Sequence, residues 1–173
     1  REPSVSIYSL AARFAVGRDI DRAIVTFDSA LGSFHGYSLM GTYLRFRSIL
    51  PDSLHRKVRE IFRSRGLYRG DTENHWVMHY TGLYLAAQTW PHEDGTRWFN
   101  GRSSDENLRE AREGIDHWMT VATTIGQGEF DSPTYMPAFL AACKTVDPSV
   151  TSTSWSLMVN LIIRHAHDKS FGF

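Results

Sequence analysis

Two kinds of helical segment alternate along this chain, and their alternation is the strongest constraint on its fold. Segments 37–48, 74–90 and 134–146 are apolar on most sides and poor in charge. Segments 51–64 and 104–124 each combine one apolar stripe with one charged face. A helix that is apolar all round is buried, whereas an amphipathic helix lies at the surface. The order therefore predicts inner and outer helices in turn.

The segment 104–124 has the clearest helical signals. Its apolar residues recur at spacings of three and four, which place them on one helix face: Leu108, Ala111, Ile115, Trp118, Met119 and Ala122. Ser103 and Glu106 have the spacing of a capping box, which favours a helix start at this point. Gly126 is a suitable stop. Segments 4–16 and 20–31, and one that begins at Asp147, are also predicted to be helical.

Inner and outer helices in alternation are what a ring of helical hairpins produces. The closed form of such a ring is the (α/α) toroid, a two-layer helical barrel. We therefore expect an all-α fold of about seven helices. Residues 1–173 form one helical domain in this interpretation. A six-hairpin barrel needs twelve helices, and the chain begins with Arg1 and ends at DKSFGF. We therefore expect an incomplete part of a larger barrel. A mature chain left after processing is the alternative to a fragment, and a compact irregular bundle is the alternative to a barrel.

Composition limits the partners. The chain has 19 basic and 19 acidic residues and a formal net charge of zero, so we expect neither nucleic acid nor an anionic membrane as a partner. No run of about 18 apolar residues is present, so no transmembrane helix is predicted. Cys143 is the single cysteine and lies among apolar neighbours, which favours a core position.

Three polar clusters precede or open the three inner helices. They are GSFHGYS with His35 and Tyr37, DTENH with Glu73, Asn74 and His75, and GQGEFDSPTY with Glu129, Asp131 and Tyr135. In a ring of hairpins all inner helices run in one direction, so their N-termini gather at one end. The pattern predicts that the three clusters line one rim around a central cavity.

The residue types in these clusters suit a catalytic or binding site. Helix N-termini favour anions, and carboxylates, histidine and tyrosine supply acid–base groups. Trp76 and Tyr80 offer aromatic faces on which sugar rings could stack. A structural interpretation is equally open for several members. Asp71 or Thr72 would cap the helix, Glu73 would complement its dipole, and Asp131 would cap the next helix.

Metal and cofactor signals are weak. His75 and His79 lie four residues apart and share a helix face, but HWVMH is not the HExxH motif of zinc proteases. The sequence also lacks GxGxxG, GxxxxGK and GxSxG. We therefore expect no metal and no cofactor.

Two stretches, DTENHWVMHYTGLYLAAQTWP and GQGEFDSPTYMPAFLAAC, resemble a group of bacterial and fungal proteins of the six-hairpin (α/α) toroid class. The shared pattern is an E-N-H triplet that opens a helix ending near W-P, followed by a charged helix and a G-E-F/W-x-S-x-x-Y motif. The resemblance covers roughly 70–165. It implies the toroid fold and favours an extracellular or periplasmic location.

The toroid class includes polysaccharide lyases, glycoside hydrolases and a dehydratase-isomerase. The resemblance therefore implies a carbohydrate-active enzyme with a poly- or oligosaccharide substrate. In its lyase form Asn74 stabilises the enolate, His75 is the base and Tyr135 is the acid. In its hydrolase form Glu129 is the acid and Glu73 or Asp131 is the base.

In either form, His35, Tyr37, Trp76 and Tyr80 would bind substrate. The sequence departs from the lyase pattern in two respects. Glu73 precedes the Asn-His pair, and no arginine lies within the motifs, although Arg97 and Arg102 follow in the next loop. Two alternatives remain open: a non-catalytic helical scaffold or binding module, and a dehydratase or isomerase with a non-carbohydrate substrate.

Overall fold

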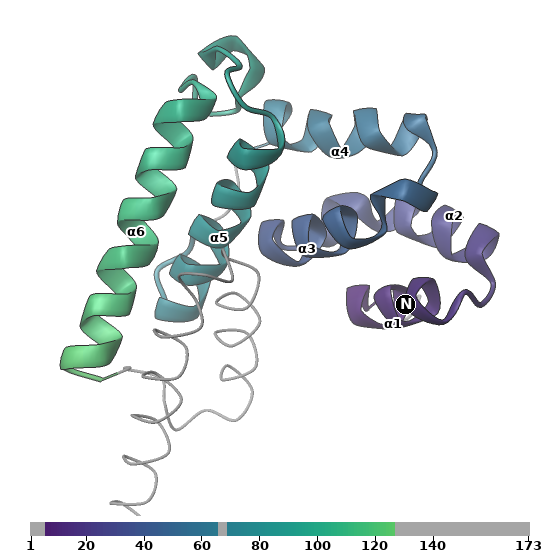
Figure 1. The fold of residues 1–173 in the computed structure, drawn as a ribbon, viewed down its shortest axis with the longest axis horizontal. Helices are drawn as coiled ribbons and strands as arrows, with labels where there is room; N and C mark the ends of the chain where they lie inside the picture. The colour runs from purple at the N-terminus through teal and green to yellow at the C-terminus, as the bar shows by residue number, and fades with distance from the viewer. Residues whose placement is uncertain (1–5, 66–68, 127–173) are drawn as a thin grey trace, which may run out of the picture.

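The computed structural model describes residues 6–65 and 69–126 (Figure 1). Within these ranges the chain contains helices and no strand. The α-helices are α1 (Ile7–Val16), α2 (Ile20–Ala30), α3 (Gly36–Phe46), α4 (Asp52–Ser64), α5 (Glu73–Thr89) and α6 (Ser104–Thr124). Single 3-10 turns lie at η1 (Leu31–Ser33), η2 (Arg47–Ile49) and η3 (Gly95–Arg97).

The predicted all-α class is confirmed for the part of the chain that the structure describes. Each helix predicted between 4 and 124 is present, with ends that agree within a few residues. The capping box is also confirmed, because Ser103 and Glu106 bond to each other's backbone N–H at the start of α6. The helices predicted at 134–146 and from Asp147 lie outside the described residues.

Helix α5 is the centre of the described structure. It contacts α3 on one side and α6 on the other (Figure 1). Most of its side chains are buried, including Val77, Leu83 and Ala86, because two neighbours cover different faces. This agrees with its prediction as an inner helix. In the described ranges, no helix has both the length and the apolar character needed to cross a membrane.

Two glycines allow the helices on either side to approach α5 closely. A Cβ atom built on Gly82 would lie 2.7 Å from the Gly36 carbonyl carbon and 2.7 Å from the Tyr37 backbone nitrogen. A Cβ atom built on Gly114 of α6 would lie 2.6 Å from the ring of Tyr80. The start of α3 therefore rests directly on the backbone of α5.

The ring arrangement itself is not confirmed. Figure 1 shows α5 and α6 side by side as a hairpin, but α3 is not parallel to α5. Inner helices of a closed toroid run in roughly one direction. The described helices therefore establish a helical assembly around α5, and the toroid stays a prediction.

Candidate functional site

Two of the three predicted polar clusters meet where α3 begins. His35 is the N-cap residue of α3, and His75 lies in the first turn of α5. Their ring centroids are 6.2 Å apart, and the ring of Tyr37 lies 6.5 Å from that of His35. The close approach at Gly82 produces this juxtaposition, because it holds the start of α3 against α5. The third cluster, with Glu129, Asp131 and Tyr135, lies outside the described residues.

The imidazole of His75 is oriented by the N-cap residue of α5, Thr72. Thr72 Oγ1 lies 2.9 Å from His75 Nδ1 and also donates a hydrogen bond to Asn74 Oδ1. One hydroxyl hydrogen cannot serve both partners. Because it is directed to Asn74, the bond to His75 requires a hydrogen on Nδ1. Neutral His75 then carries its basic lone pair on Nε2, which is the form a general base needs.

Gly70 contributes to the same positioning. Its φ of +68° is in the left-handed region, and a Cβ atom at this position would lie 2.6 Å from His75 Cβ. Glycine is suited to this place for both reasons. The turn before α5 is thereby fitted closely around the His75 side chain.

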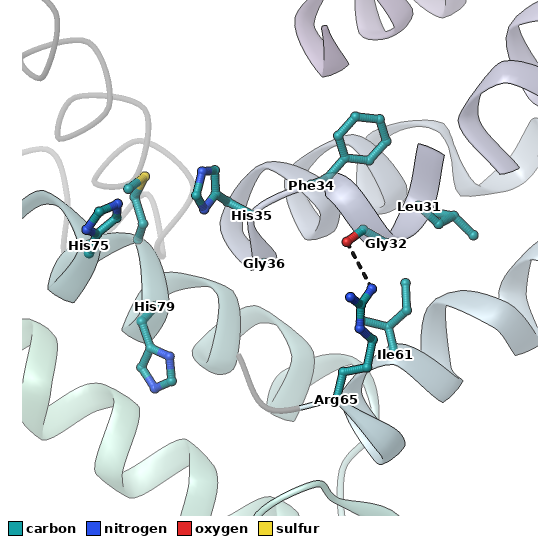
Figure 2. A pocket seen from close by; sticks show the side chains of 10 residues that line it. Leu31, Gly32, Phe34, His35, Gly36, Ile61, Arg65, His75 and His79 are labelled. Atoms are coloured by element: carbon teal, nitrogen blue, oxygen red, sulfur yellow. Dashed lines mark hydrogen bonds between the residues drawn. The ribbon is translucent and has the colours of Figure 1, made fainter. Parts of the chain in front are cut away.

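A pocket of about 180 Å³ opens between the ends of α3, α4 and α5 (Figure 2). Its described lining combines apolar residues with three histidines and one arginine: Leu31, Gly32, Phe34, His35, Gly36, Ile61, Arg65, His75, Met78 and His79. No aspartate or glutamate is among these lining residues. The described part of the pocket is therefore mixed in polarity, and it lacks acidic side chains.

Sequence reasoning did not identify Arg65. It lies immediately after α4, where a basic residue reads as an ordinary helix end. In the structure its Nη1 donates a 2.9 Å hydrogen bond to the Gly32 carbonyl oxygen, which Figure 2 shows. That bond directs the guanidinium toward η1 and the pocket. No local pattern in the sequence signals this contact, because it depends on how α4 packs beside η1.

His35 has a pKa below its ordinary value of 6.5. Burial is the main cause, because it disfavours the charged imidazolium, and the nearby His75 adds repulsion. His35 is therefore neutral near pH 7. A histidine must be neutral to accept a hydrogen bond or to act as a base.

This shift predicts a loss of stability on acidification. Above pH 6.5 His35 is neutral in both the folded and unfolded states, so the shift has no effect. As pH falls through 6.5, the unfolded chain takes up the proton first, and the free energy of unfolding decreases until the folded state also protonates. Urea unfolding between pH 5 and 8 should show this decline, and His35→Gln should reduce it. An identical decline in the variant would contradict the assignment.

Tyr37 lies beside His35 but belongs to the packed interior. Its hydroxyl shares a 2.7 Å hydrogen bond with the hydroxyl of Tyr8 on α1. Burial raises the pKa of Tyr37 far above its ordinary value, and the bond to Tyr8 adds to the effect. Tyr37 therefore stays protonated at neutral pH and ties α1 to the start of α3.

Three of the predicted site residues are directed toward α6 instead of the pocket. Glu73 Oε1 accepts a 2.8 Å hydrogen bond from Trp118 Nε1, and Trp76 Nε1 donates to the Gly114 carbonyl oxygen at 3.3 Å. Tyr80 is buried against Gly114. These contacts give Glu73, Trp76 and Tyr80 structural roles in the α5–α6 interface.

Asn74 is only 4% exposed and accepts from Thr72. It contacts the site through Thr72 and is not among the described lining residues. The Asn74 amide can therefore help to position His75 through Thr72. It is too deeply buried to contact a substrate directly.

The three histidines that line the described pocket are not gathered around one point. Figure 2 shows His79 pointing away from His35 and His75, and its ring packs 5.0 Å from that of Tyr80. Among the residues placed in the structure, no group of three or more His, Cys, Asp and Glu side chains could hold a metal ion.

In comparisons with known proteins, no family model, no curated protein and no solved structure matches this chain. The geometry of the pocket and the sequence motifs therefore carry the functional argument.

Proposed function

We propose that this chain provides part of the acid–base site of a carbohydrate-active enzyme, with His75 as the group that transfers the proton. The observation that carries the proposal is the hydrogen bond of His75 Nδ1 to Thr72, in a side chain that lines a pocket shared with His35. A base held by a hydrogen bond at one ring nitrogen has a fixed ring orientation, which favours proton transfer in a defined direction. The carbohydrate substrate follows from the resemblance of the E-N-H and G-E-F-D-S-P-T-Y motifs.

The described lining supports a lyase over a hydrolase. A glycoside hydrolase ordinarily needs two carboxylates that flank the scissile bond. The pocket lining contains none among the residues described, and Glu73 is bonded to Trp118. A lyase instead needs a base for a carbon-bound proton and a group that neutralises an adjacent carboxylate. His75 and Arg65 fit these two requirements.

In the proposed elimination His75 Nε2 removes the proton from the carbon next to the substrate carboxylate. The electron pair of that C–H bond forms the new C=C bond, and the glycosidic C–O bond breaks. An acid donates a proton to the departing oxygen, a role for which the sequence offers Tyr135. The (α/α) toroid remains the proposed architecture, supported by the buried inner helix α5 and the amphipathic α6 that returns beside it.

The second candidate is a non-catalytic helical module. The bonds of Glu73 to Trp118 and of Thr72 to Asn74 favour it, because both satisfy polar groups within the packed structure. In this function His75 would serve only as a partner of Thr72.

The two candidates predict different results for His75→Ala. With a set of uronate polymers as substrates, the unsaturated product of a lyase can be followed by its absorbance. We expect turnover to fall by about 10²–10⁴-fold, the usual contribution of a general base, with a melting temperature within a few degrees of the parent. A rate equal to that of the parent would reject the base assignment.

Two control variants separate catalysis from stability. His92→Asn changes an exposed histidine beyond the far end of α5 and should alter neither property. Trp118→Phe removes the donor to Glu73 and should lower the free energy of unfolding by about 1.5–3 kcal/mol, the range for a hydrogen bond to a charged group. Its turnover per folded molecule should stay near that of the parent.

A further inference from the structure

The described pocket lining has an unbalanced charge. Arg65 is always cationic, and His35 and His75 each gain a positive charge on protonation, while no carboxylate is among the described lining residues. Two carboxylates on the neighbouring helices have other partners: Glu60 pairs with Arg63, and Asp28 pairs with Lys57. The charge of Arg65 is thus not balanced by an acidic lining residue in the described structure.

The side chain of Arg65 is exposed but held in place. Its Nη1 bonds to the Gly32 carbonyl oxygen, which uses one of five guanidinium N–H groups. A Cβ atom on residue 32 would lie 2.4 Å from that nitrogen, so glycine makes room for the guanidinium to rest on η1. An arginine fixed by a neutral carbonyl keeps its charge and most of its donors for another acceptor.

The pocket has room for a small anion. Its volume of about 180 Å³ is many times the ~10–15 Å³ that a cavity needs to hold one water. The pocket also lies at the start of α3, where Gly36 lines it and the positive end of the helix dipole favours negative charge. His35 and His75 stand together at this end of α3 in Figure 2.

We propose that this pocket binds an anionic group, a carboxylate or a phosphate, through the guanidinium of Arg65, with a ring N–H of His35 as a further donor. The binding site itself does not require the chain to be an enzyme. Only the identity of the anion rests on the proposed function, which would supply it as the carboxylate of an acidic sugar.

The test measures binding without turnover. Inorganic phosphate is titrated into the full chain by calorimetry at pH 7, at constant ionic strength set by sodium chloride. Arg65→Met should weaken phosphate binding at least ten-fold, because an ionised pair with hydrogen bonds is lost. Arg63→Met is the matched control: it removes the same charge two residues away, from a side chain that pairs with Glu60 and does not line the pocket. It should leave the affinity within two-fold.

A second variant guards against misfolding. If Arg65→Met melts well below the parent without phosphate, His35→Phe provides the test. It keeps an aromatic ring and removes the N–H donor, so we expect a several-fold loss of affinity. Absence of phosphate binding by the parent would overturn the proposal. So would equal losses in the Arg65 and Arg63 variants, since that result indicates a diffuse electrostatic effect.

Glucuronate and glucose identify the source of the anion. Tighter binding of glucuronate than of glucose, lost in Arg65→Met, supports a carboxylate site for an acidic sugar. Binding of phosphate without glucuronate leaves the anion site standing and removes its link to the carbohydrate function. Equal binding of glucose and glucuronate, unchanged in Arg65→Met, overturns the proposal because the site would then recognise no charge.

Discussion

Gly82→Ala is expected to lower the free energy of unfolding by about 1–3 kcal/mol, the range for overpacking a close contact. Alanine normally stabilises a helix interior by about 1 kcal/mol relative to glycine, so the expected sign is opposite to the intrinsic propensity. The new methyl group would lie 2.7 Å from backbone atoms of Gly36 and Tyr37. Backbone cannot rotate aside as a flexible side chain does, so α3 must move away from α5.

The same displacement should reach the candidate site. His35 precedes the first residue of α3, and its pKa is lowered by burial and by His75. If α3 moves outward, both causes weaken, and the pKa of His35 should rise toward 6.5. An NMR titration of the His35 ring protons would measure this change. A stability loss without any change at His35 would show that the contact supports packing alone.

Gln88→Ala is the control for Gly82→Ala. Gln88 is an exposed residue of the same helix, six positions further on. Its substitution should change the free energy of unfolding by less than about 0.5 kcal/mol and leave His35 unaffected. Increased stability in Gly82→Ala, measured by urea denaturation, would contradict the close packing of α3 on α5.

Helical periodicity predicted the elements of this fold well because the signals are local. The capping box of Ser103 and Glu106 and the apolar stripe from Leu108 to Ala122 each depend on residues within one helix. The path of α3 across α5 depends instead on a contact between Gly82 and Gly36, which are distant in sequence. A glycine within an apolar helix is compatible with several partners, so the sequence could not specify this one.

The sequence predicts one site at the start of α5, yet the residues of this site lie on different faces of the helix. Glu73, Trp76 and Tyr80 are spaced by three and four residues and face α6. His75 and Gly82 are seven residues apart and face α3. Residues three, four or seven apart share a face, whereas neighbours in sequence are turned by about 100°. Periodicity could have separated the two groups, but it could not show which face borders a pocket.

Arg65 illustrates the limit of prediction for the site. Its role depends on the carbonyl group of Gly32 and on the absence of described acidic lining residues. Backbone carbonyls are present at every position of a sequence, so a contact with one of them leaves no pattern. The position of Arg65 beside the pocket therefore becomes visible only when α4 and η1 are placed together.

Arg59→Met is expected to lower the free energy of unfolding by about 3 kcal/mol, the lower end of the range for removing one partner of a buried ion pair. Arg59 is 8% exposed, and its guanidinium lies 4.9 Å from the Trp90 ring and 4.8 Å from the Trp98 ring. Its Nη2 donates to Glu93 and to the Arg97 carbonyl oxygen. Arg59 thereby attaches α4 to the connection between α5 and α6.

The loss should combine two effects of similar size. Cation–π contacts with desolvated rings contribute about 1–2 kcal/mol. Methionine has a side chain of similar length and removes the charge that makes these contacts favourable. Glu93 would then lack its buried partner, although its side chain is partly exposed, which limits the penalty. Arg59→Lys should recover only part of the loss, because an ammonium group lacks the planar guanidinium that contacts the two indole rings.

A double-mutant cycle with Glu93→Gln tests the pairing directly. If the ion pair carries much of the effect, the double variant Arg59→Met/Glu93→Gln should be more stable than the sum of the single losses predicts, by about 0.5–3 kcal/mol. Arg56→Met, on the exposed side of α4, is the matched control and should change stability by less than about 0.5 kcal/mol. Additive single losses would assign the stabilisation to the tryptophan contacts, and a neutral Arg59→Met would exclude both contributions.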